Sequence, residues 1–187
     1  MADPKKVYWD ACAWIALIKD EPGRAECCRY VVDQARTGNL QIWTSAFTLA
    51  EVFKKTVGGN PLKLPETKDL EFEQYIEQEF VVVAQVDFDI GVLARRLLRM
   101  HAKLRKPADA IHLATAVLYN LDEFHTYDEV NLLILNHSVK RRDGKPLTIC
   151  TPPVNPMPGL FEKLAEEVVA TDTTPPVPPA SPEHPTA

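Results

Sequence analysis

Four acidic residues lie at positions where the neighbouring residues favour either burial or the end of a strand. Asp10 and Asp128 each follow a run of apolar, strand-forming residues. Glu51 lies on the apolar side of a helical pattern, and Asp109 lies in the first turn of a helical segment that is otherwise mostly apolar. In α/β proteins the functional crevice lies beyond the carboxyl ends of the parallel strands. These four acids are therefore candidates for one shared site.

A group of buried carboxylates needs a positive partner. Burial raises the cost of each negative charge, and crowded carboxylates oppose one another's ionisation. Hard divalent cations such as Mg²⁺ or Mn²⁺ prefer oxygen ligands, with water and substrate phosphate completing their shell. We therefore predict a Mg²⁺ or Mn²⁺ site. Its metal-binding and catalytic residues are Asp10, Glu51, Asp109 and Asp128.

Each of these acids also has an ordinary structural explanation. Asp10 can cap a helix, and Asp128 can stabilise a turn. Asp109 in a first helical turn is favoured by the helix dipole, and Glu51 can be a surface residue. For any single acid the ordinary explanation carries more weight. The combination of the four favours a functional site.

Strand-like and helix-like segments alternate along the chain. The expected strands are residues 7–10, 40–43, 80–86, 124–126 and 147–150. The expected helices are residues 11–18, 24–36, 65–78, 89–104 and 107–119, and one that runs from a cap at Thr44 or Ser45 to about Val57. This alternation predicts an α/β sandwich with a mainly parallel sheet.

The composition changes near residue 151. Of the 16 prolines, ten lie from Pro152 onward. We expect a compact domain over residues 1–151, and a Pro-rich linker with a short docking helix over 152–170. Residues 171–187 should be disordered, because they hold too few bulky apolar side chains to offset the entropy cost of ordering.

The composition also limits the class of protein. A formal net charge of -5 argues against a protein that coats nucleic acid through bulk charge. The apolar stretch 7–18 is interrupted by Asp10, so we interpret it as a buried strand and helix rather than a signal peptide. The four cysteines form no C-x-x-C pair, which favours core thiols over zinc or disulfides. We expect a soluble, cytoplasmic protein without a membrane span.

Four sequence blocks together resemble one known family. They are residues 7–13, 44–52, 106–116 and 124–128, and each contains one of the four acids. In order and spacing these blocks resemble PIN-domain ribonucleases and, within that family, VapC-type toxins of bacterial toxin–antitoxin pairs. The likeness covers about residues 6–150.

The resemblance implies a fold and a site. The fold is a three-layer sandwich with a sheet of four or five parallel strands and helices on both sides. The four acids line a pocket for Mg²⁺ or Mn²⁺. Thr126 matches a small hydroxyl residue that orients an acid from outside the metal shell. The resemblance also places Cys12 outside the metal shell, in a supporting role. Relatives usually have a hydroxyl or amide residue at this position, so the thiol is a departure from the family.

The resemblance also implies an activity and partners. The activity is metal-dependent endonucleolytic hydrolysis of RNA, which leaves a 5′-phosphate. The partners are an inhibiting antitoxin protein and a second copy of the chain in a homodimer. Two other functions stay open: a module that binds RNA or a protein without cutting, and a nuclease for structured DNA.

Two further features bear on the site. Six basic residues precede the block with Asp109, with no acid between them, and are equally consistent with RNA-backbone contacts and with a solvated helix face. They are Arg95, Arg96, Arg99, Lys103, Arg105 and Lys106. His112 lies three residues after Asp109, and we interpret it as a packed or hydrogen-bonded histidine because oxygen-ligand sites seldom need imidazole.

Overall fold

A five-stranded parallel sheet forms the centre of the protein. The computed structural model describes residues 3–52, 54–57 and 60–156, and the chain divides into two units, Met1–Val154 and Asn155–Ala187. The strands of the first unit's main sheet are β1 (Lys5–Trp9), β2 (Leu40–Ser45), β5 (Val81–Ala84), β6 (Glu123–His125) and β7 (Thr148–Cys150). Their order is β5-β2-β1-β6-β7, and every pair is parallel.

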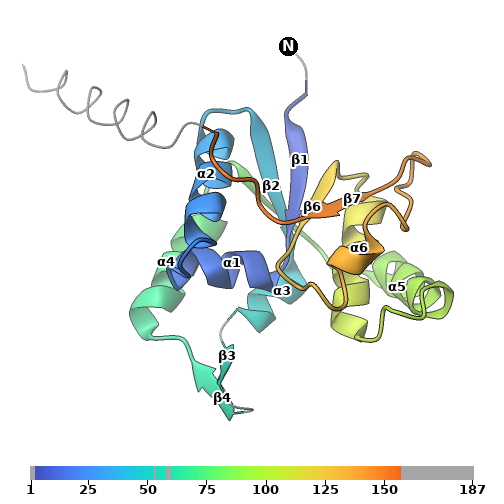
Figure 1. Cartoon of the computed structure of the whole chain (residues 1–187), viewed down its shortest axis with the longest axis horizontal. Coiled ribbons are helices and arrows are strands. Elements are labelled where there is room, and N and C mark those ends of the chain that lie inside the picture. Colours follow the sequence, from blue (N-terminus) through green and yellow to red (C-terminus); the bar gives the residue numbers. More distant parts are fainter. Residues whose placement is uncertain (1–2, 53, 58–59, 157–187) are drawn as a thin grey trace, which may run out of the picture. The chain divides into compact units, whose positions relative to one another are not determined.

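Helices cover both faces of this sheet (Figure 1). On one side lie α1 (Ala11–Ile18), α2 (Ala25–Arg36) and α4 (Glu66–Ile76), and on the other lie α5 (Phe88–Met100) and α6 (Pro107–Leu118). Side chains alternate along β1. Val7 and Trp9 therefore pack in the core that α1, α2 and α4 cover, while Tyr8 packs in the core that α5 and α6 cover. The predicted three-layer α/β sandwich with a mainly parallel sheet is confirmed.

The helix expected from Thr44 or Ser45 to about Val57 is much shorter in the structure. Helix α3 covers Ala46–Glu51, and the chain then forms an antiparallel pair of strands, β3 (Lys54–Val57) and β4 (Asn60–Lys63). The prediction was wrong because it treated the Gly-Gly at 58–59 only as a helix stop. Two glycines between short runs are also a hairpin signal. Glu51 is consequently the last residue of its helix.

The connections bring the site residues to one end of the sheet. Asp10 joins β1 to α1, and Ser45 ends β2 and begins α3 through a capping box with Thr48. Pro107 occupies the first turn of α6, as predicted. After β6 the chain turns at Asp128 into a short 3₁₀ helix, η1 (Leu133–Leu135). Because all five strands are parallel, these turns share the carboxyl edge.

Three other expectations from the sequence have different outcomes in the structure. Within the described residues, no helix has the length and apolar character needed to cross a bilayer. Only Cys28 of the four cysteines is a buried core thiol, while Cys12 is exposed and Cys27 and Cys150 are partly buried. The expected docking helix and the Pro-rich tail lie outside the described residues.

Candidate metal centre

Asp10 is held in place by the first turn of α1. Its Oδ1 atom accepts hydrogen bonds from the backbone N–H of Cys12 at 2.9 Å and of Ala13 at 3.1 Å. The residue is only 3% exposed. Burial raises the pKa of Asp10 to about 6, although His112, Thr126 and the two backbone N–H groups oppose that rise. The ordinary capping role of Asp10 is therefore real, and it fixes a carboxylate in a costly environment.

Asp109 carries an unsatisfied oxygen. It lies in the first turn of α6 and is 8% exposed, and its Oδ2 atom is buried without a hydrogen-bond partner among the described residues. Burial raises its pKa, Lys106 and His112 lower it, and the charges of Asp128 and Glu51 raise it further. A buried carboxylate oxygen without a donor is destabilising unless a cation or water satisfies it.

Glu51 is held by a histidine from another helix. Its Oε2 atom lies 2.7 Å from Nε2 of His112, which is 3% exposed. The expectation of a hydrogen-bonded histidine is thus confirmed, but its partner is one of the predicted site acids. The spacing of His112 from Asp109 on α6 was the available signal.

Asp128 stabilises the turn that follows β6. Its Oδ1 atom accepts from the backbone N–H of Val130 at 3.0 Å and of Asn131 at 2.8 Å, and its Oδ2 accepts from the Asn131 amide at 2.8 Å. Burial opposes ionisation, but the hydrogen bonds from Asn131 and the charge of Lys106 lower the pKa of Asp128 overall. Asp128 therefore serves both the turn and the acidic site.

Thr126 links two of the acids. It is fully buried, and its Oγ1 atom accepts the backbone N–H of Asp128 at 3.0 Å. Its hydroxyl group also hydrogen-bonds to Asp10 and lowers the pKa of that carboxyl. A hydroxyl can donate and accept at once, so both bonds are compatible.

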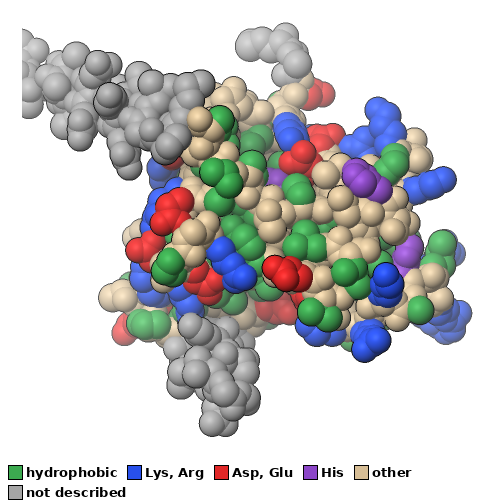
Figure 2. Space-filling model, in the orientation of Figure 1, with side chains coloured by type: hydrophobic (Ala, Val, Ile, Leu, Met, Phe, Trp, Pro, Cys, Tyr) green, Lys and Arg blue, Asp and Glu red, His purple; other side chains and the backbone are tan. Residues whose placement is uncertain are grey.

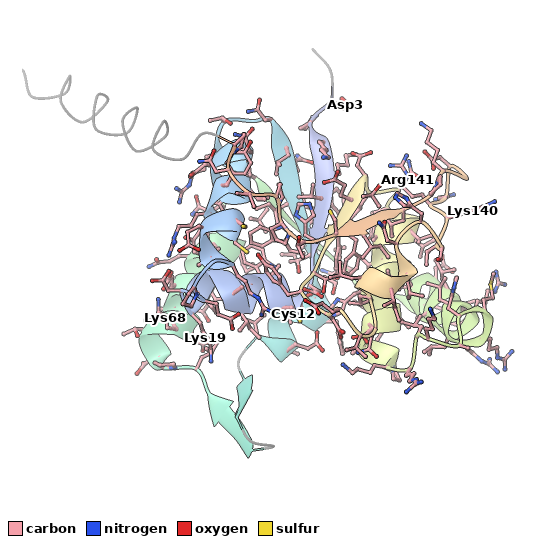
Figure 3. All side chains as sticks on the ribbon, in the orientation of Figure 1. Asp3, Cys12, Lys19, Lys68, Lys140 and Arg141 are labelled. Atoms are coloured by element: carbon pink, nitrogen blue, oxygen red, sulfur yellow. The ribbon has the colours of Figure 1, made fainter. Side chains whose placement is uncertain are left out.

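The four acids converge on Cys12, which Figure 3 labels at the start of α1. Partial withdrawal from water raises the pKa of its thiol. The negative charges that raise it further are those of Asp10, Asp128, Asp109 and Glu51. The acids are close enough to act on one thiol, but no three of them bring carboxylate oxygens within 4.8 Å of one another among the described residues.

Comparison with known proteins assigns this arrangement to a family. The model of the PIN domain family matches residues 7–132, which is more than half of the chain. The chain belongs to the PIN domain family. The matched range contains all four acids. Among curated proteins, none matches the chain.

Two solved structures are similar to this PIN domain. The toxin VapC20 of Mycobacterium tuberculosis, described as cleaving the sarcin-ricin loop, has 16% sequence identity and a TM-score of 0.50, with 65% of this chain and 89% of that chain covered. VapBC2 from Rickettsia felis, bound to a DNA fragment from its promoter, has 15% identity and a TM-score of 0.47, with 66% and 87% covered. At 16% identity, the likeness to VapC20 shows the fold alone.

The acidic edge of the PIN domain fits a hard divalent cation. The donors are carboxylate oxygens, which Mg²⁺ and Mn²⁺ prefer. The unpartnered Oδ2 of Asp109 and the raised pKa of Asp10 both mark buried carboxylates whose charge the surrounding residues compensate only in part. Asp10 and Asp109 are therefore the strongest candidates as ligands, and Glu51 and Asp128 are already held by other side chains.

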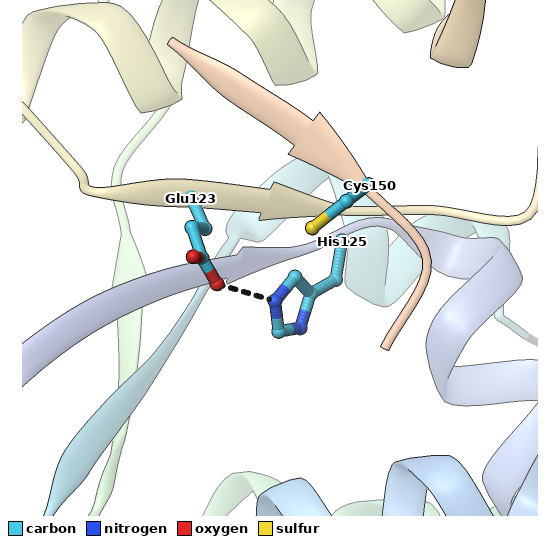
Figure 4. Close-up of side chains that lie close together, drawn as sticks. All are labelled: Glu123, His125 and Cys150. Atoms are coloured by element: carbon cyan, nitrogen blue, oxygen red, sulfur yellow. Dashed lines mark hydrogen bonds and ion pairs between the residues drawn. The ribbon is translucent and has the colours of Figure 1, made fainter. Parts of the chain in front are cut away.

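A second group of donor atoms lies on β6 and β7 (Figure 4). One donor atom from each of Glu123, His125 and Cys150 lies within 4.8 Å of the others. Trp9 donates its indole N–H to Nδ1 of His125 at 3.2 Å, so Nε2 carries the ring proton and donates to Glu123 at 3.1 Å. Both ring nitrogens are thus engaged, and a metal would have to break this network. We interpret it as structural.

The basic residues predicted for RNA contact are exposed. Figure 2 shows Lys and Arg side chains along the edge where Figure 1 places α5. Within the described part of the chain, five of these six residues form no ion pair: Arg95, Arg96, Arg99, Lys103 and Arg105. Lys106 instead pairs with Asp128, at 3.4 Å.

Proposed function

We propose that this PIN domain is a Mg²⁺- or Mn²⁺-dependent endoribonuclease and the toxin of a toxin–antitoxin pair. The observation that carries the proposal is the buried Oδ2 atom of Asp109. It has no hydrogen-bond partner among the described residues, at the same acidic edge where the pKa of Asp10 is raised to about 6. Buried carboxylates of this kind destabilise the fold. Their presence together at one edge therefore points to a function.

The acids share one part in the proposed reaction. Asp10, Glu51, Asp109 and Asp128 would hold the cation through their carboxylate oxygens, with Asp10 and Asp109 as the strongest candidates. Thr126 fixes the orientation of Asp10 relative to Asp128. When bound, the cation supplies an activated water and positive charge for the phosphate and the leaving oxygen. No side-chain nucleophile is needed, and Cys12 supports the site through its backbone N–H to Asp10.

RNA is the proposed substrate. The exposed basic residues of α5 and the loop after it precede Asp109 directly in sequence, so they can guide a phosphate backbone toward the acids. The residues proposed to contact the RNA backbone are Arg95, Arg96, Arg99, Lys103, Arg105 and Lys106. The fold likeness to VapC20, a toxin that cleaves an RNA loop, supports RNA over DNA.

The proposed partners follow from the family. An antitoxin protein would block the acidic edge, a second copy of the chain would form a homodimer, and the protein would act in the cytoplasm. These proposals rest on the resemblance to VapC-type toxins and on the PIN domain match.

Incubation of the purified protein with a panel of cellular RNAs tests this function. Parallel reactions contain Mg²⁺, Mn²⁺ or EDTA, and Asp109→Asn protein is the matched control because it keeps the shape of the side chain and loses its charge. Discrete RNA fragments should appear with metal and wild-type protein only. RNA that is bound but left intact under all conditions would instead indicate a binding module, and selective cutting of structured DNA would indicate a DNA nuclease.

A further inference from the structure

A chain of buried hydrogen bonds runs from Glu51 into the core. Oε2 of Glu51 lies 2.7 Å from Nε2 of His112, and Nδ1 of His112 lies 2.8 Å from the hydroxyl of Tyr8. Tyr8 is fully buried on β1, two residues before Asp10. Three elements that are distant in sequence, α3, α6 and β1, are therefore joined by one imidazole ring.

The hydrogen bonds of His112 hold its ring on both sides. An ionised Glu51 can only accept, so Nε2 of His112 carries a proton. The Tyr8 hydroxyl can donate to Nδ1 of a neutral ring or accept from Nδ1 of a charged ring, so it holds the ring in both states. The oxygen of Tyr8 is in turn hydrogen-bonded by the side chains of Ser45 and Thr48, at the start of α3. The network thus supports both ends of the helix that carries Glu51.

Glu51 depends on such a support because its own helix is short. Helix α3 has 6 residues, Glu51 is the last of them, and the side chain is 30% exposed. An isolated helix of this length is unstable, and a free glutamate side chain samples several rotamers. His112 lies on the 12-residue helix α6 and packs against the rings of Tyr8 and Phe47, with centroids 5.8 and 5.6 Å away. The rigid partner is the histidine.

The position of His112 on α6 couples two of the site acids. His112 follows Asp109 by three residues, so both side chains lie on one face of the helix. The helix that carries Asp109 to the acidic edge therefore also carries the donor that holds Glu51. The separation of the two carboxylates is set by this rigid unit.

We propose that His112, held in place by Tyr8, is a positioning residue that holds the Glu51 carboxylate toward the cation of the acidic edge. This inference rests on the proposed function, because it assigns how that site binds its metal. Without the donor, Glu51 must be ordered when the cation binds, so metal affinity falls. His112 does not touch substrate, so the rate at saturating metal should change little.

The experiment measures Mn²⁺ binding by isothermal titration calorimetry on the full chain, without RNA. His112→Leu removes the donor and should weaken Mn²⁺ binding by about 10-fold or more, the usual effect of losing a residue that orients a ligand. His112→Gln offers an amide N–H in its place and should restore most of the affinity. Tyr8→Phe removes only the hydroxyl and should give an intermediate loss, and it carries the test if His112→Leu does not fold.

Two controls separate positioning from general stability. Leu121→Ala removes a fully buried side chain from the core that α6 covers, and should lower the melting temperature without changing Mn²⁺ affinity. In a Glu51→Gln background, His112→Leu should cause no further loss of affinity, because the two residues act as one unit.

Several results would overturn the inference. They are wild-type Mn²⁺ affinity in both His112→Leu and Tyr8→Phe, equal losses in the Leu and Gln variants, an additive loss in the Glu51→Gln background, or no Mn²⁺ binding by the wild-type protein. The expected binding pattern in a protein that never cleaves RNA would support the role of His112 and reject the ribonuclease.

Discussion

The ammonium nitrogen of Lys106 lies 3.4 Å from Oδ2 of Asp128, so the chain places one of its own cations beside an acid of the proposed metal centre. Partial burial lowers the pKa of Lys106, but the charges of Asp109 and Asp128 outweigh it and raise the pKa overall. Lys106 thus offsets part of the carboxylate repulsion while no metal is bound, and it competes with the metal for Asp128.

Lys106→Met should therefore strengthen Mn²⁺ binding. The side chain of Lys106 is 57% exposed, so solvent screens the interaction and the expected gain is only about 2- to 5-fold at low ionic strength. Lys103→Met, an exposed lysine of the same segment, is the control and should leave the affinity unchanged. Weaker binding in Lys106→Met would mean that Lys106 supports the metal site instead of competing with it.

Asp10→Asn should separate activity from stability. The amide oxygen can still accept from the N–H groups of Cys12 and Ala13, so the helix cap survives. RNA cleavage should fall at least about 100-fold, because a ligand charge is lost. Unfolding by urea in EDTA should show Asp10→Asn to be more stable than Asp10→Ala by about 1 kcal/mol, the usual value of a cap. Wild-type cleavage by the Asn variant would remove Asp10 from the site.

The stability of the metal-free protein should depend on pH through Asp10. Its folded pKa of about 6 lies above the ordinary 3.8, so the folded state favours the protonated acid and loses stability as pH rises through this window. The advantage of Asp10→Asn over wild type should grow by up to about 3 kcal/mol between pH 3 and pH 7. The measurement is the free energy of unfolding in EDTA at each pH.

Glu123, the other acid with a strongly shifted pKa, should not add to the pH dependence of stability in the upper part of that series. Its hydrogen bond to His125 and its pairing with Lys5 lower its pKa to about 2, although burial opposes this. It is ionised in both folded and unfolded states above about pH 5 and adds no slope there. A stability difference between Asp10→Asn and wild type that is flat with pH would contradict the raised pKa of Asp10.

The exposed arginines of α5 should contribute to RNA affinity by contacting the phosphate backbone. Arg96→Gln with Arg99→Gln should weaken binding of a catalytically inactive Asp109→Asn protein to RNA by several-fold, and should flatten the salt dependence of that binding. Arg29→Gln with Arg36→Gln on α2 is the charge-matched control. Equal losses in both pairs, measured by fluorescence anisotropy across a salt series, would show that the effect comes only from net charge.

Removal of the Pro-rich end should leave the domain intact. Deletion of residues 171–187 is expected to leave the melting temperature unchanged, because the segment contains six prolines and few bulky apolar side chains. Deletion from Thr148 onward is the contrasting control, since it removes β7 with the buried Ile149 and should unfold the protein. A large fall in melting temperature after the short deletion would move the domain boundary toward the C-terminus.

Much of the fold was predictable from local patterns. The apolar run that ends at Trp9 and the helical spacing from Ala11 define β1 and α1, and Pro107 marks the start of α6. The local pattern failed where two signals overlapped. Residues up to Val57 continue a helical spacing, yet the following glycines permit a hairpin, and only pairing with Asn60–Lys63 decided between them.

The amino-acid sequence by itself determined the four acids, the alternation of strands and helices, and the cap at Asp10, because each depends on residues within a few positions of one another. The capping hydrogen bonds of Asp10 come from Cys12 and Ala13, two and three residues along the chain. The tertiary structure decided the state of each carboxylate. Glu51 meets His112 across 61 positions of the chain, and Asp109 is left with an unsatisfied oxygen by the packing around α6. Burial and long-range hydrogen bonds are properties of the folded core, and no local spacing encodes them.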